Sequence, residues 1–239
     1  MGTIDLHLPV EPVMPKRKDY RIGCIGSGFI MRDCHLVAYR DAGFNPYAIS
    51  SRTFDNAKAA AELRQIPVVY RTWEELIGDP RIEILDIAIP PDRQLEVVRR
   101  AVKQDHIKGI LCQKPLAMNA RDAHEIVELC EGAGIKIAVN SNMRYDQSMR
   151  ALKTILDRGY LGEPVLATIE MRAIPHWQEF LHTYSPSKSS IWEYITSIFS
   201  VICSEIRRKS PRLRAGTPGR RSRILTGSRS TRSTMPMSC

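Results

Sequence analysis

Strand-like and helix-like segments alternate six times between residues 20 and 140, with short connections. The strand-like runs cover residues 22–25, 47–50, 67–70, 82–89, 110–112 and 135–139. The run 82–89 is apolar on both alternating faces except at Glu83 and Asp86, as in a strand that helices cover on both sides. This alternation predicts an α/β fold with a doubly wound, mostly parallel sheet.

A glycine turn, Gly26-Ser27-Gly28, joins the first strand to the first helix. Gly26 allows a tight turn, and Gly28 lets the backbone approach a pyrophosphate at the helix N-terminus, where free N–H groups favour anions. The third position of the dinucleotide fingerprint holds Met31 instead of a small residue. An ordinary strand-to-helix turn is therefore an alternative interpretation of this stretch.

The candidate binding residues follow the predicted strands. Ligands of parallel sheets bind at the carboxyl ends of the strands, which meet at one edge. The cofactor candidates are Gly26, Gly28, Phe29, Ile30, Ser51, Arg52, Thr53, Ile89, Pro90, Gln113 and Lys114, and the substrate-side candidates are Asn142 and Arg144.

The end of the second strand carries Ser51-Arg52-Thr53, where an NAD-preferring site would show an acidic residue for the ribose 2′-hydroxyl. A guanidinium and hydroxyls suit a 2′-phosphate, which favours NADP. The alternative is that Thr53 caps the helix that follows and that Arg52 is an exposed residue without a role in binding.

The charge of the chain is concentrated near its end. Of its net charge of +9, all lies after residue 185, where 11 Lys and Arg face 2 acidic residues and serine is abundant. No stretch approaches the ~20 apolar residues of a membrane span, and no signal peptide is evident. The six cysteines lack metal or redox spacing, so we expect free thiols, no metal site and a cytoplasmic location.

A family resemblance rests on several motifs together: GCIGSGFI, AIPPDRQLEVVRRAV, LCQKPLA, VNSNMRYDQ and DRGYLGEPV. These resemble the Gfo/Idh/MocA oxidoreductases over residues 19–184. The resemblance implies a Rossmann-like domain that binds NAD or NADP, a second α+β domain with an antiparallel sheet, and a sugar or polyol substrate. It also implies homo-oligomers for full-length relatives.

Lys114 in QKPLA matches the lysine of the family's EKP motif, which implies a catalytic place beside the nicotinamide and the reacting hydroxyl. A cation there stabilises a developing alkoxide and helps to remove its proton. Gln113 replaces the usual glutamate and cannot pair ionically with Lys114. Gln94 stands where many relatives have histidine and receives no role, and His35 has no partner that the sequence identifies.

Four segments are expected: a polar, poorly ordered leader (1–18), a dinucleotide-binding domain (19–143), the start of a substrate domain (144–185) and a basic Ser/Arg-rich tail (186–239). The family pattern stops after Tyr184. Reading the later codons in a shifted frame permits GIYHIDLFRYLFGDP, which resembles the missing family segment. The hypothesis is a frameshift near residues 185–190, which would leave the chain inactive as written.

Two functions of other classes remain open at this stage. One is a non-catalytic nucleotide-binding or interaction protein. The other is binding of nucleic acid through the basic tail, since Arg/Ser-rich segments can contact phosphates. The apolar and aromatic residues 191–203 are unlike a solvated tail, which makes nucleic acid the weaker interpretation.

Overall fold

A computed structural model of the chain describes residue 8 and residues 11–162. The chain divides into two compact units, one formed by residues 13–141 and one by residues 1–12 together with 142–239. The predicted domain boundaries at 18, 143 and 185 stay predictions. The part of the predicted substrate domain after residue 162, the frameshift region and the basic tail lie outside the described residues.

Within residues 13–141 the described strands form one sheet in the order β3-β2-β1-β4-β5-β6, and every neighbouring pair is parallel. This confirms the predicted Rossmann-like α/β sheet. The strands are β1 (Arg21–Ile25), β2 (Asn45–Ser50), β3 (Val68–Tyr70), β4 (Ile84–Ile87), β5 (Gly109–Gln113) and β6 (Lys136–Asn140).

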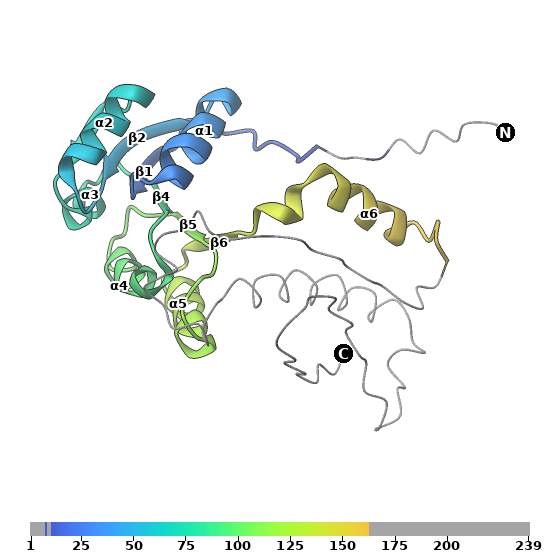
Figure 1. Ribbon diagram of the computed structural model, residues 1–239. Helices are drawn as coiled ribbons and strands as arrows, with labels where there is room; N and C mark the ends of the chain where they lie inside the picture. Colours follow the sequence, from blue (N-terminus) through green and yellow to red (C-terminus); the bar gives the residue numbers. More distant parts are fainter. Residues whose placement is uncertain (1–7, 9–10, 163–239) are drawn as a thin grey trace, which may run out of the picture. The chain divides into compact units, whose positions relative to one another are not determined.

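Helices cover both faces of this sheet (Figure 1). The helices are η1 (Ile30–His35), α1 (Leu36–Ala42), α2 (Phe54–Arg64), α3 (Trp73–Gly78), α4 (Pro91–Ala101) and α5 (Ala120–Gly132). One buried cluster joins α1 and α2 to β1 and β2, and the larger cluster joins α3, α4 and α5 to the opposite face. The chain runs from β1 outward through β2 to β3, and then continues on the other side of β1 through β4 and β5 to β6. Because crossovers between parallel strands are right-handed, these two directions place helices on opposite faces of the sheet.

Local signals in the sequence start several of these helices. The side chain of Thr72 accepts a hydrogen bond from the backbone N–H of Glu75, and Asn119 caps α5 in the same way. Pro91 stands at the first position of α4, where its missing N–H costs nothing. Thr53 occupies the N-cap position of α2, but its side chain makes no cap hydrogen bond. Thr53 is therefore at the predicted N-cap position, but the hydrogen bond expected from such a cap is not formed.

The helix after the glycine turn begins as a π-helix, η1, and becomes α-helical only at Leu36. Met31, at the third position of the glycine fingerprint, is fully buried against Ile22 and Cys24. A glycine at this position allows close packing of helix and strand, whereas a methionine needs space between them. The wide first turn provides that space, which the sequence pattern did not predict.

Residues just before β1 are held against the sheet, which differs from the poorly ordered leader expected for residues 1–18. The ammonium of Lys18 donates to the carbonyl of Ala42 at 2.9 Å. The guanidinium of Arg17 pairs with Asp19 at 2.8 Å and approaches Glu83 at 3.5 Å. Long basic side chains thus order this segment along the amino ends of the strands.

In the second unit, the described residues form η2 (Asn142–Tyr145) and α6 (Gln147–Asp157). Gly159 follows α6 with a φ of +71°, as is typical of a helix C-terminus. Among the described residues, no helix combines the length and the apolar character that crossing a membrane requires.

Asp79, at the end of α3 and before β4, offers a test of how a buried carboxyl contributes to stability. Asp79 is buried, and burial alone would raise its pKa, but hydrogen bonds from Arg81 and Tyr70 lower that pKa to about 2. The folded state therefore gains stability from ionised Asp79 above pH ~4, the ordinary range of a carboxyl, and loses it as the pH falls toward 2.

We expect Asp79→Asn to lower the free energy of unfolding by about 1–2 kcal/mol at pH 7, because a charged hydrogen bond to the half-exposed Arg81 is lost. The difference from wild type should shrink as the pH falls below 4. Urea unfolding of both proteins at pH 7, 4 and 2.5 measures it, with the exposed Asp41→Asn as the control. A difference that is independent of pH would contradict the assignment.

Candidate functional site

The glycine turn lies where three strand ends meet. Gly26 has a φ of +106°, and its N–H donates to the carbonyl of Ser50 at the end of β2. A Cβ atom at position 26 would lie 2.4 Å from the carbonyl oxygen of Ala88, just after β4. Both the backbone conformation and this close approach require glycine.

Gly28 lies in different surroundings. It is exposed, and a Cβ atom built on it would meet no atom within 4 Å. The next residue, Phe29, has 57% of its side chain exposed, and Ile30 begins η1. The turn thus presents backbone and open space in front of the helix, which is the shape that a pyrophosphate at this position needs.

The end of β2 is joined to the glycine turn by side chains. The hydroxyl of Ser27 donates to the hydroxyl of Ser51 at 2.8 Å. Arg52 and Thr53 follow and are exposed. Arg52 is thus an exposed residue directly after Ser51, whose hydroxyl is bonded to the glycine turn.

The QKP segment forms the turn that leaves β5. Gln113 is the last residue of β5, and its side-chain carbonyl accepts a hydrogen bond from the backbone N–H of Lys114 at 2.9 Å. The Lys114–Pro115 peptide bond is cis. Lys114 is half-buried, and this burial lowers the pKa of its ammonium. Desolvation disfavours the charged form, so a larger fraction of this amine is neutral than in an exposed lysine.

Gln94, to which the sequence gave no role, holds this turn. It is fully buried on α4. Its amide nitrogen faces the carbonyl oxygens of Gln113, Pro115 and Leu116 at 3.0, 2.9 and 3.3 Å. Its amide oxygen accepts from the backbone N–H of Gln113 at 2.9 Å. The sequence offers one signal for this role: the residues one helical turn away from Gln94 have no side chain that could bond its amide.

The remaining predicted residues divide between the two units. Ile89 follows β4 and is partly buried, and Pro90 is the exposed N-cap of α4. They join the glycine turn, the end of β2 and the QKP turn at the carboxyl edge of the sheet, as predicted. Asn142 and Arg144 are exposed residues of η2 in the other unit.

A buried polar cluster joins η1 to two strands, which corrects the expectation that His35 has no partner. Asp86, only 1% exposed, accepts hydrogen bonds from Nδ1 of His35 and from the hydroxyl of Tyr39, both at 2.7 Å. The amide nitrogen of Asn140 lies 2.7 Å from Nε2 of His35. Since Asn140 donates to Nε2, the ring proton sits on Nδ1, where it faces the carboxylate. Burial, and then Asp86, raise the pKa of Tyr39.

A family model described as an oxidoreductase family with an NAD-binding Rossmann fold, GFO_IDH_MocA, matches residues 20–141, about half of the chain. This chain belongs to that family. The 1,5-anhydro-D-fructose reductase of Ensifer adhaerens is 29% identical over 62% of this chain and 44% of its own length. The myo-inositol 2-dehydrogenase of Thermotoga maritima is 29% identical over 64% of this chain and 45% of its own length.

Solved structures agree. The myo-inositol dehydrogenase of Lactobacillus casei, in complex with NAD(H) and myo-inositol, is 30% identical, with a TM-score of 0.56 over 61% of this chain and 43% of that one. The chain thus spans less than half the length of the relatives that it matches. The matched part is the NAD-binding domain of the family, and this confirms the predicted resemblance.

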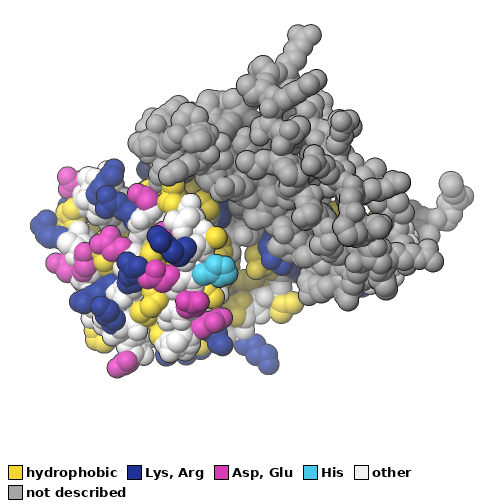
Figure 2. Space-filling view, turned by 90° about the horizontal axis from the view of Figure 1, so that it is seen from below, with side chains coloured by type: hydrophobic (Ala, Val, Ile, Leu, Met, Phe, Trp, Pro, Cys, Tyr) yellow, Lys and Arg dark blue, Asp and Glu magenta, His cyan; other side chains and the backbone are white. Residues whose placement is uncertain are grey.

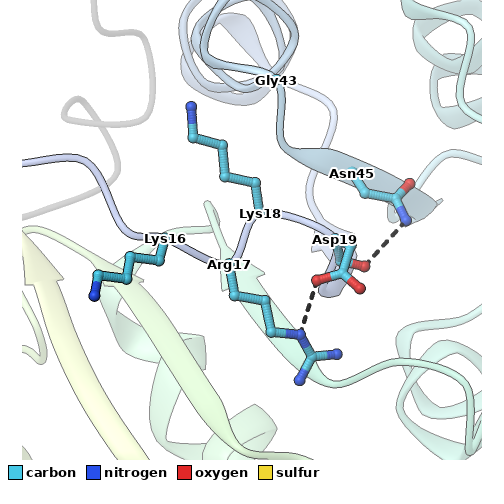
Figure 3. A pocket seen from close by; sticks show the side chains of 6 residues that line it. All are labelled: Lys16, Arg17, Lys18, Asp19, Gly43 and Asn45. Carbon is cyan, nitrogen blue, oxygen red and sulfur yellow. Dashed lines mark hydrogen bonds and ion pairs between the residues drawn. The ribbon is translucent and has the colours of Figure 1, made fainter.

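A surface hollow of about 770 Å³ lies at the amino edge of the sheet, opposite the edge at which the strands end. Lys16, Arg17, Lys18, Asp19, Gly43 and Asn45 line it. Figure 3 shows that Asp19 is joined there to Arg17 and to Asn45. These contacts fix the segment that enters β1. Among the described residues, no group of three or more His, Cys, Asp and Glu side chains could hold a metal ion.

The two glycines of the turn should respond differently to a single methyl group. Gly26→Ala is expected to cost at least ~1–3 kcal/mol in stability, because the backbone conformation is strained for alanine and the new Cβ meets the Ala88 carbonyl. Gly28→Ala should be neutral or stabilising by up to ~1 kcal/mol, since the site is open. Thermal and urea unfolding of both variants measure the contrast, and equal losses would contradict it.

Proposed function

We propose that this chain holds NADP or NAD at the carboxyl edge of its sheet and that Lys114 assists proton transfer at a sugar or polyol hydroxyl. The observation that carries the proposal is the placement of two elements on one sheet edge. One is a glycine turn open at Gly28, and the other is a turn that presents the partly buried Lys114. The proposed reaction class is oxidation of a carbinol, or reduction of a carbonyl.

The residues present fit a dinucleotide. The turn at Gly26 needs glycine for the fold, whereas the space in front of Gly28 is filled by no atom of the described residues. Backbone N–H groups at the start of a helix favour a pyrophosphate in such a space. Ser51 and Arg52 would lie beside the ribose, and Ile89 and Pro90 would border the cofactor along the same edge.

Lys114 supplies the acid–base group in this proposal. A bound nicotinamide would accept or give the hydride. The neutral amine of Lys114 can take the proton of a hydroxyl, and its ammonium form can return that proton and stabilise a developing alkoxide. Burial lowers the pKa of Lys114 and so brings this exchange closer to neutral pH. Gln113 is a neutral amide, so it brings no carboxylate that would raise the pKa again.

The substrate class is proposed from the relatives. Their names refer to 1,5-anhydro-D-fructose, D-apiose and myo-inositol, all of them polyhydroxylated. Asn142 and Arg144 are proposed as the substrate-side groups, with hydrogen-bond donors for sugar hydroxyls. On the face of the molecule seen in Figure 2, acidic and basic side chains of the described residues are interspersed. Such a surface does not favour a nucleic acid over a small polyol.

Replacement of Gly28 tests the cofactor proposal. Gly28→Val should abolish binding of NAD and NADP without loss of stability, because its side chain would occupy the space proposed for the pyrophosphate. Calorimetric titration at up to millimolar cofactor measures binding, and thermal unfolding checks the fold. The exposed Gly132→Ala at the end of α5 is the control. Unchanged binding by folded Gly28→Val would remove the proposed pyrophosphate site.

Replacement of Arg52 tests the preference for NADP. Arg52→Ala should weaken NADP binding by about 1.5–3 kcal/mol, the value of a lost charged hydrogen bond, and leave NAD binding nearly unchanged. Lys58→Ala, which removes one exposed positive charge from α2, the helix that follows Arg52, is the matched control. If Arg52→Ala weakens both cofactors equally, Arg52 does not contact a 2′-phosphate.

A further inference from the structure

The neutral side chain of Gln94 makes an unusual number of contacts with one turn. From the first turn of α4 it reaches three carbonyl oxygens and one N–H, all within residues 113–116. It is fully buried, so water cannot replace these contacts. A buried amide whose donors and acceptor are all used fixes the backbone that it contacts more firmly than apolar packing does.

The bonded residues flank Lys114 on both sides. Gln113 precedes the lysine and Pro115 follows it, and both are held by the same amide group. The side-chain oxygen of Gln113 in turn accepts from the N–H of Lys114. Two side-chain amides therefore hold the backbone around Lys114: that of Gln94 on α4 and that of Gln113 at the end of β5.

We propose that Gln94 is a positioning residue, which holds the 113–116 turn so that the amine of Lys114 stays at the partly buried place where it can act. The inference deepens the proposed function and rests on it for the role of Lys114. Gln94 contacts neither cofactor nor substrate in this proposal. It acts through the backbone on either side of the lysine.

Other side chains could not make the same set of contacts. Leucine has a similar size but neither donors nor an acceptor, and it would leave the buried N–H of Gln113 and the facing carbonyls unpaired. Histidine carries its donor and its acceptor on different nitrogens of a rigid ring, so it could keep part of the set. Glutamine offers a donor group and an acceptor side by side on one flexible side chain.

The test is the titration of the Lys114 amine in the full chain, followed by the NMR shift of its side-chain ¹³Cε and assigned with Lys114→Arg. Wild-type Lys114 should titrate below the ordinary value of about 10.4. In Gln94→Leu it should titrate closer to that value, because the released turn lets the amine reach water. Gln94→His, which keeps part of the contacts and is the safer variant for folding, should give a smaller displacement in the same direction.

Val98→Ala is the matched control. Val98 is fully buried on the same helix, and its truncation removes core volume without removing a hydrogen bond to the turn. It should lower the melting temperature while Lys114 titrates as in wild type. If folded Gln94→Leu and Gln94→His also leave the titration unchanged, Gln94 is only a core residue and the inference is overturned.

Cofactor binding separates this inference from the proposed function. If wild type binds no NAD or NADP by calorimetry, the proposed function fails. A displaced titration in the Gln94 variants would still establish that this side chain positions Lys114. If wild type binds cofactor but the titration does not move, the proposed function stands and the positioning role does not.

Discussion

The close approach at Gly26 is the contact on which the carboxyl edge of the sheet depends. At this residue β1 ends, its N–H is bonded to the end of β2, and the carbonyl of Ala88 after β4 occupies the space where a side chain would be. The ends of β2 and β4, the two strands on either side of β1, can therefore come together around one residue. The open position at Gly28 follows from this arrangement, because the chain leaves the sheet at once and turns its backbone outward.

The sequence predicts most of the fold because the physical signals are local. Alternating apolar runs, the caps Thr72 and Asn119, and Pro91 at a helix start each act within a few residues of the chain. The π-helical start of η1 was not predicted, because it arises from the size of Met31 against Ile22 and Cys24, a contact between two elements. The contacts of the residues before β1 depend on tertiary neighbours in the same way.

The candidate site shows the same division. Residues that follow strands could be placed on one edge from the chain order alone, since all neighbouring strands are parallel. The partners of His35 could not, because Asp86 and Asn140 lie 51 and 105 residues away in sequence. Yet Asp86 was visible as a polar interruption in the most apolar strand. A charged residue in such a place requires buried donors, and His35 and Tyr39 provide them.

The two glutamines near Lys114 have one electrostatic consequence together. Gln113 and Gln94 carry amide side chains, which are neutral at every pH. Their hydrogen bonds hold the turn without adding a charge beside the lysine. A carboxylate at 113 would favour the ammonium and oppose the effect of burial, whereas an amide leaves burial as the cause that lowers the pKa of Lys114. The turn is thereby held by neutral groups, and burial lowers the pKa of the lysine that it carries.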